Sequence, residues 1–197
     1  MPHARLPFLL AVLSLAVLPA RAGGQAVERI ATYAIDGGTG PELYASIGER
    51  GPVAGGVRAI AHTTFDLKWS RKYEPRGGAC VLASARPWLT VTYTVPKPAG
   101  RLPDAVRKRW DAFAAGILAH EKVHGDTIKA MVQDIEGFSV GFTVENDPQC
   151  KRIRQELTRR LKAASDRQRQ QGRDFDREEF REGGAMHRLI LALVNGG

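Results

Sequence analysis

The residues best suited to chemistry lie in one short motif, His120-Glu121-x-x-His124, which has the pattern HExxH. Apolar residues recur around it at helical steps of three and four, so the motif is predicted to lie on an α-helix. Residues four apart lie one turn above each other on the same helix face, which brings the two imidazoles together. Two neutral imidazoles aimed at one point supply half of a tetrahedral zinc site. The apolar residues of this periodic pattern are Trp110, Phe113, Ile117, Ile128, Met131 and Ile135.

Glu121 is predicted to act as a general base rather than as a metal ligand. It lies about 100° round the helix from His120, close enough to reach a water molecule held by a metal. This is the arrangement of zinc hydrolases, in which the metal lowers the pKa of water and the glutamate takes the proton. Peptide hydrolysis is the default reaction, with Glu121 passing the proton on to the leaving amine. A chance occurrence is the alternative, but two histidines and a glutamate would be a costly way to fill a core.

The N-terminal segment 1–22 is predicted to be a secretory signal peptide. A positive charge at Arg5 precedes an apolar run over residues 6–18, and residues 20–22 read Ala-Arg-Ala, which is typical of a cleavage site. The run is too short to span a membrane, and no other segment of the sequence approaches the length of a transmembrane helix. The mature chain is therefore expected to begin near Gly23, as a secreted or periplasmic protein.

The chain contains two cysteines, Cys80 and Cys150, both beyond the predicted signal peptide. In an oxidising compartment, one widely separated pair is expected to form a disulfide. Closing so long a loop would stabilise the fold by about 4 kcal/mol through loop-closure entropy. The alternative role, zinc ligation, has less support because neither cysteine belongs to a CxxC pair.

Strand patterns dominate the first half of the mature chain. Residues 27–35 alternate in polarity and predict a first strand, and residues 58–69 give the clearest alternation in the sequence. Residues 80–95 form a further strand pattern, in which Pro87 indicates a bulge or an edge. The last two strands are separated by a short turn and predict an antiparallel hairpin. His62 falls on the polar face of its strand, so it is expected to face solvent.

Helix signals occur in four places. Thr39 and Glu42 form a capping-box pattern before a short helix, which is expected to end at Gly48 and Gly51-Pro52. Asp104 is a candidate N-cap for the HExxH helix, and Gly137 a candidate end. Further helices are expected from Asp147-Pro148, with a stripe of Ile153, Leu157 and Leu161, and over residues 185–194.

Together these elements predict one α+β domain, residues 23–197, with no internal repeat. We expect an N-terminal antiparallel sheet packed against the central HExxH helix and a C-terminal helical region, a zincin-like arrangement. About 175 residues are enough for one domain with a substantial core.

Several scattered residues carry a resemblance to a known family. The sequence resembles the bacterial family of predicted secreted zinc-dependent proteases, catalogued as a domain of unknown function. The resemblance implies that His120 and His124 bind zinc and that Glu121 is the catalytic base. The matching residues are Gly51-Pro52, Gly55 or Gly56, Thr63 or Thr64, Trp69, Cys80, Trp110, the HExxH motif and Cys150.

The chain departs from that family near its C-terminus, where the third zinc ligand is expected. Phe175-Asp176 and Gly184-Ala185 match the family pattern, but the Thr-x-His-Gly between them is missing. Aligning on Gly184-Ala185 places Glu179 at the histidine position, and a catalytic zinc needs three protein ligands and one water. Glu179 is therefore the first choice, with Asp176 as the alternative and His187 third. The alternative for both Glu179 and Asp176 is that they belong to a solvated helix face and bind no metal.

A second class of function remains open. The formal charge is +8, and it falls to +6 once Arg5 and Arg21 are removed with the signal peptide. A basic stretch over residues 151–173 would allow the protein to be a non-catalytic module that binds an anionic envelope component or a partner protein, with a structural or degenerate metal site. Nucleic acid is not expected as a ligand, because no aromatic residues interleave with the charge. If the protein is a zinc-dependent peptidase, its expected partner is a peptide or protein substrate. The sequence does not predict the oligomeric state.

Overall fold

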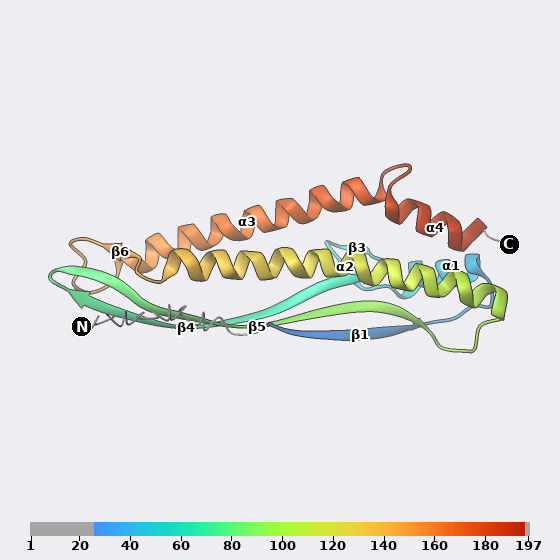
Figure 1. Cartoon of the computed structure of the whole chain (residues 1–197), viewed down its shortest axis with the longest axis horizontal. Helices are drawn as coiled ribbons and strands as arrows, with labels where there is room; N and C mark the ends of the chain where they lie inside the picture. The colour runs from blue at the N-terminus through green and yellow to red at the C-terminus, as the bar shows by residue number, and fades with distance from the viewer. Residues whose placement is uncertain (1–25, 196–197) are drawn as a thin grey trace, which may run out of the picture.

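A computed structural model describes residues 26–195; the predicted signal peptide and the start of the mature chain near Gly23 lie outside them. The molecule is long: one long helix lies along a sheet of extended strands, and a second long helix lies mainly on the far side of the first (Figure 1). None of the described helices is both long and apolar enough to cross a lipid bilayer. The predicted combination of a sheet, an HExxH helix and a C-terminal helical region is confirmed as an α+β fold.

The main sheet contains β1 (Val27–Ile35), β4 (His62–Arg76), β5 (Ala79–Pro98) and the short β6 (Thr143–Val144). Its strand order is β1-β5-β4, and β6 pairs with the start of β5. The predicted β4–β5 hairpin is confirmed as antiparallel. The prediction of an antiparallel sheet is wrong for β1, which pairs with β5 in parallel. The reason is that β4 runs opposite to β1 on the far edge, and β5 then turns back between them.

Three prolines of β5 lie where the strand has a partner on one side only. Pro87 faces β4 before β1 begins, and Pro96 and Pro98 face β1 after β4 has ended. Proline lacks an N–H, so it is tolerated in strands only where no neighbour needs that donor. The edge predicted at Pro87 is therefore correct, while the register irregularity lies elsewhere, between Lys72 and Tyr73.

The first helix, α1 (Gly40–Arg50), begins with the predicted capping box. Glu42 N–H donates to Thr39 Oγ1 at 3.4 Å, and the Glu42 carboxylate accepts from Thr39 N–H at 3.1 Å. The helix continues through Gly48 and stops at Gly51, where the backbone turns away. A two-stranded hairpin follows, β2 (Val53–Ala54) with β3 (Val57–Arg58), so the predicted strand over 58–69 begins later than expected, at His62.

The HExxH helix is α2 (Asp104–Ser139), the longest element of the chain. Asp104 is its first helical residue rather than the predicted N-cap, and the helix passes through Gly137 to Ser139. Its apolar stripe packs on the inner face of β5, and Gly125 lies so close to Tyr93 that a Cβ there would meet the phenol oxygen at 2.2 Å. A glycine after the HExxH motif therefore lets α2 approach the sheet.

The second long helix, α3 (Arg152–Phe180), runs back along α2 (Figure 1). The predicted start at Asp147-Pro148 is too early, because the helix begins at Arg152 with Lys151 in the N-cap position. The Asp147 carboxylate still accepts from the N–H groups of Lys151 and Ile153 in the first turn, both at 2.8 Å. The polar stretch after Ala164 continues as the same helix. The last helix, α4 (Ala185–Asn195), matches the predicted terminal helix and packs on α1 and α2.

The predicted disulfide between Cys80 and Cys150 is present, with the two Cα atoms 5.2 Å apart. It joins the start of β5 to the loop between α2 and α3. Both cysteines are buried in a cluster with Leu82, Ile153 and Leu157. This bond therefore fixes the end of the molecule at which the chain turns from α2 into α3.

Candidate metal centre

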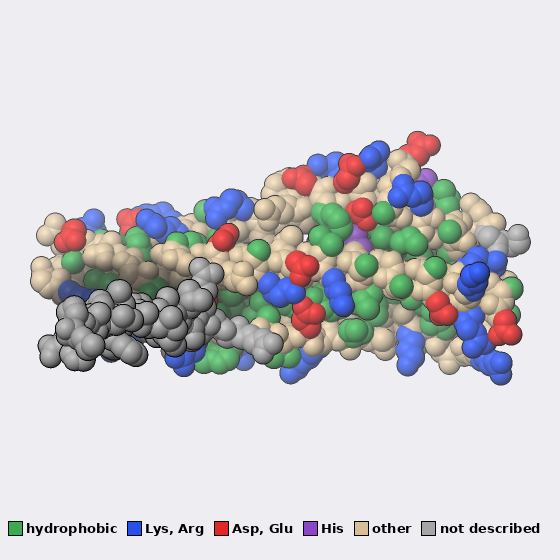
Figure 2. All heavy atoms as spheres, in the orientation of Figure 1, with side chains coloured by type: hydrophobic (Ala, Val, Ile, Leu, Met, Phe, Trp, Pro, Cys, Tyr) green, Lys and Arg blue, Asp and Glu red, His purple; other side chains and the backbone are tan. Residues whose placement is uncertain are grey.

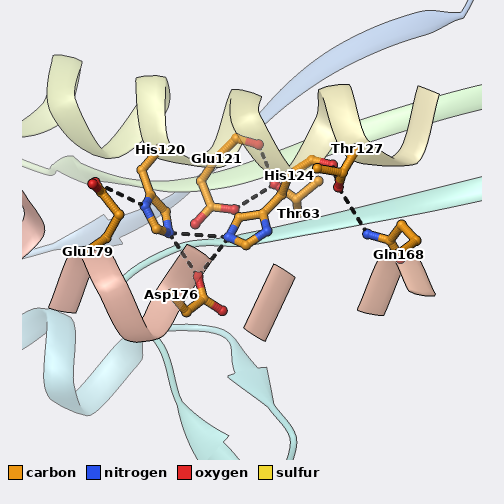
Figure 3. Close-up of polar contacts among 8 residues, drawn as sticks. All are labelled: Thr63, His120, Glu121, His124, Thr127, Gln168, Asp176 and Glu179. Atoms are coloured by element: carbon orange, nitrogen blue, oxygen red, sulfur yellow. Dashed lines mark hydrogen bonds and ion pairs between the residues drawn. The ribbon is translucent and has the colours of Figure 1, made fainter. Parts of the chain in front are cut away.

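The two histidines lie on one face of the HExxH helix, as the sequence predicts, and this face meets α3. The Nε2 atoms of His120 and His124 lie 3.2 Å apart, one turn from each other on α2 (Figure 3). His120 is buried, whereas His124 is half-buried. Each imidazole thus directs the same ring nitrogen toward one point between the two long helices.

Asp176 of α3 completes a group of three possible metal ligands. Its Oδ1 lies 2.8 Å from His124 Nε2 and 3.2 Å from His120 Nε2. Zinc bonds of 2.0–2.1 Å in a tetrahedral site place ligand atoms about 3.3 Å apart. The three observed distances are close to that value. His120, His124 and Asp176 therefore have both the chemistry and the spacing to hold a zinc ion.

Electrostatics explains why these three atoms need a positive charge between them. Lone pairs of two neutral imidazoles and a carboxylate repel at such distances unless a proton or a cation is shared. Burial lowers the pKa of His124, but the hydrogen bond and charge of Asp176 outweigh it and raise this pKa above its ordinary value. Burial would raise the pKa of Asp176, yet hydrogen bonds from both histidines hold it well below its usual range. The cluster thus favours a carboxylate beside a cation.

Glu179, the first choice from the sequence, occupies a different place. Its Oε2 lies 3.8 Å from Nδ1 of His120, on the side of the ring away from Asp176 (Figure 3). That nitrogen is buried and has no hydrogen-bond partner among the described residues. Carboxylates beside the outer nitrogen of a ligating histidine orient the ring. Among the described residues, the structure brings Asp176 rather than Glu179 to the two Nε2 atoms, and His187 instead accepts a hydrogen bond from Gly183.

Two aromatic rings hold His120 in place, and the sequence pattern did not assign them this role. Phe175 stacks on the imidazole with ring centres 4.7 Å apart, and Phe180 meets it edge-on at 5.5 Å. Gly172, also on α3, faces His124, and a Cβ there would lie at ordinary contact distance from Nδ1, 3.4 Å. The clue in the sequence was the position of Phe175, directly before Asp176.

Glu121 is buried and is held by a residue that sequence reasoning missed. The hydroxyl of Thr63, at the start of β4, lies 2.5 Å from Glu121 Oε2 and 3.1 Å from the Glu121 carbonyl oxygen. A hydroxyl has one proton, so it donates to one of these oxygens at a time. Alternation along this strand puts Thr63 on the face opposite His62, but nothing in that pattern identified Glu121 as its partner.

The site opens into a cleft of about 790 Å³ between the start of β4, the β2–β3 hairpin, α2 and α3. Glu121, His124 and Asp176 line it, as does His62. The prediction that His62 faces solvent is thus incomplete, since the side chain is half-buried in the cleft wall. Basic and acidic side chains are interspersed over the face of the molecule shown in Figure 2.

Fold and site define a class: an α+β protein whose HExxH helix and a following helix bring two histidines and an aspartate together beside a buried glutamate. The chain belongs to a family of bacterial proteins of unknown function, DUF922, whose family model matches residues 30–184. These residues include all of the site described above. No curated protein and no solved structure matches the chain.

Proposed function

We propose that this protein is an exported zinc-dependent peptidase with a zincin-like site. In this proposal His120, His124 and Asp176 hold the zinc ion and Glu121 is the general base. The observation that carries it is the convergence of three donor atoms at 2.8–3.2 Å beside a buried glutamate in a cleft. The disulfide supports export, because such bonds persist mainly in oxidising compartments.

A zinc ion in this site would polarise a substrate carbonyl and lower the pKa of water. In the proposed reaction the protein itself contributes the carboxylate of Glu121, held in a fixed position. Thr63 occupies Oε2 of Glu121, and Oε1 accepts no hydrogen bond from the described residues. Glu121 lines the cleft, so that oxygen is available to take a proton from water and return it to the leaving amine. Phe175 stacks on the ring of His120, and the Glu179 carboxylate, 3.8 Å from Nδ1, favours the tautomer that carries its proton there and leaves Nε2 free for the metal.

The sheet supports a peptide as the substrate. β4 forms an edge of the described sheet, and its first residues, His62 and Thr63, line the cleft next to Glu121. The unpaired backbone of an edge strand binds extended peptides by adding a strand. A peptide paired with β4 would therefore pass along the wall that carries Thr63 and come close to Glu121.

The test compares the native protein with Glu121→Gln, both loaded with zinc, on a protein or mixed-peptide substrate. Glu121 is not among the three donors, so the variant should keep its zinc. Its turnover should fall by at least about 100-fold, because a positioned general base contributes that much or more. Peptidase activity retained in a zinc-loaded Glu121→Gln protein would contradict the assignment of the base.

The alternative of a basic binding module gains little from the structure. Most cations of α3 contact side chains of the chain itself, which describes a solvated helix face rather than a free docking surface. A zinc-free protein that binds acidic matrices in a salt-dependent way would favour this alternative. The contacts that α3 cations make with other side chains of the protein are Arg159 with Glu156, Lys162 and Arg169 with Asp166, Arg154 over Tyr73, and Arg160 over Phe142.

A further inference from the structure

The charges that line the cleft differ sharply between its centre and its rim. Glu121 and Asp176 are the only carboxylates among the described lining residues, and both belong to the proposed catalytic machinery. The cations are Arg58 of β3 and Arg169 and Arg173 of α3, which reach the cleft from two different elements. A peptide in the cleft therefore meets guanidinium groups on both the hairpin and the helix, and no acidic group outside the site.

Two of these arginines lack a charge partner in the described chain. Arg169 pairs with Asp166, but no carboxylate of residues 26–195 lies within ion-pair distance of Arg58 or Arg173. Arg58 donates instead to the backbone oxygen of Gly51 at 2.7 Å, and Arg173 to the side chain of Gln170. Elsewhere on α3, Arg159 pairs with Glu156 and Arg177 with Asp174, each three residues away.

We propose that Arg58 and Arg173 select substrates through a peptide carboxylate, either an acidic side chain near the scissile bond or the C-terminal carboxylate. The inference rests on the proposed peptidase function and adds its specificity. A guanidinium group offers a planar fork of donors that matches a carboxylate, and a cleft focuses its field on the ligand. A bound zinc ion would add to the same positive potential and disfavour basic peptides.

The first test measures binding without turnover, using zinc-loaded Glu121→Gln protein and fluorescence anisotropy of labelled peptides. One peptide carries several glutamates and an amidated C-terminus, and a second carries glutamines and the same amide. A third carries glutamines and a free C-terminal carboxylate. The first or the third should bind about fivefold more tightly than the second, which is the upper range for one ion pair in water. Which of the two does so identifies the source of the carboxylate.

Charge-removing variants show whether the two arginines are responsible. Arg173→Gln and Arg58→Gln should each reduce the difference between the acidic and neutral peptides, and the double variant should abolish it. Arg58→Lys should retain part of it, which separates loss of charge from damage to the hairpin. Arg167→Gln is the matched control, because Arg167 lies on α3 outside the cleft lining. Equal binding of all three peptides, or a preference that survives in the double variant, would overturn the inference.

Cleavage-site profiling of the native enzyme on a peptide library separates this inference from the proposed function. Acidic residues enriched at one position near the cut, or cleavage confined to the C-terminus, support both. Cleavage with no such preference overturns the inference and leaves the peptidase standing. A preference for acidic peptides in binding, with no cleavage by the zinc-loaded native protein, supports the inference and counts against the peptidase.

Discussion

The two ends of the α2–α3 pair differ in how their polar groups are held. At the end near the disulfide, the Asp147 carboxylate accepts two backbone N–H groups and Cys80 is bonded to Cys150, while the buried hydroxyl of Ser139 has no hydrogen-bond partner among the described residues. At the site, three acceptor atoms converge and the buried Nδ1 of His120 has no hydrogen-bond partner. The first end is held by a covalent bond and by hydrogen bonds to Asp147, whereas the second needs a cation or protons to balance its three convergent acceptors.

This difference indicates that stability and function are placed at separate ends of the same helix pair. His120 precedes the end of α2 by about 19 residues, which corresponds to about 28 Å of helix. Variants at one end should therefore change stability and variants at the other should change metal binding.

The largest effect is expected at the disulfide end. Replacing Cys80 and Cys150 together with serine should lower the free energy of unfolding by about 4 kcal/mol, because the bond closes a loop with a sequence separation of 70 residues. Urea unfolding of the native and variant proteins measures this. Zinc content of the folded variant should stay unchanged, and a loss of zinc would show that the two ends are not independent.

The next effect distinguishes Asp176 from Glu179. Asp176→Asn should weaken zinc binding by at least about 100-fold, because loss of an outer orienting group alone costs 10–100-fold. Glu179→Gln should weaken it by only about tenfold, since Glu179 contacts the outer nitrogen of His120. Competition with a chromogenic chelator measures both affinities. The reverse order would restore Glu179 as the third ligand.

A smaller effect is expected in acid. Burial would raise the pKa of Asp147, but backbone N–H groups of Ile153, Arg152 and Lys151 outweigh it and lower this pKa. The carboxylate therefore contributes stability that is fully present above its unfolded pKa of about 4 and is lost as pH falls through the folded pKa. Urea unfolding at pH 6 and pH 3 should show a larger loss for the native protein than for Asp147→Asn. Equal losses would show that Asp147 is not responsible.

Much of this arrangement could be predicted from sequence, because it depends on local geometry. The spacing of His120 and His124 fixes them on one helix face, and the capping box at Thr39 involves only neighbouring residues. With two cysteines in the sequence, each has one possible disulfide partner. The choice of Asp176 over Glu179 was not accessible. The two acids are three residues apart on α3 and therefore lie on one face, so only the axial position of α3 along α2 decides which one meets the histidines.

The parallel pairing of β1 and the role of Thr63 were beyond sequence reasoning for a related reason. Alternation in a strand shows which side chains share a face, but it contains no information on strand direction or on the partner across the layer. Alternation over residues 58–69 puts Thr63 on the face opposite the polar face that carries His62. That it meets Glu121 depends on how α2 sits on the sheet, which Gly125 and Tyr93 determine through their close contact.

The central claim is that His120 and His124 share one zinc ion with an acid of α3. Metal analysis of the purified mature protein, native against His120→Ala, tests it most directly, with His187→Ala as the matched histidine control. The account predicts stoichiometric zinc in the native and His187→Ala proteins and its loss in a folded His120→Ala protein. A native protein that takes up no zinc, or a His120→Ala protein that keeps it, would contradict the account.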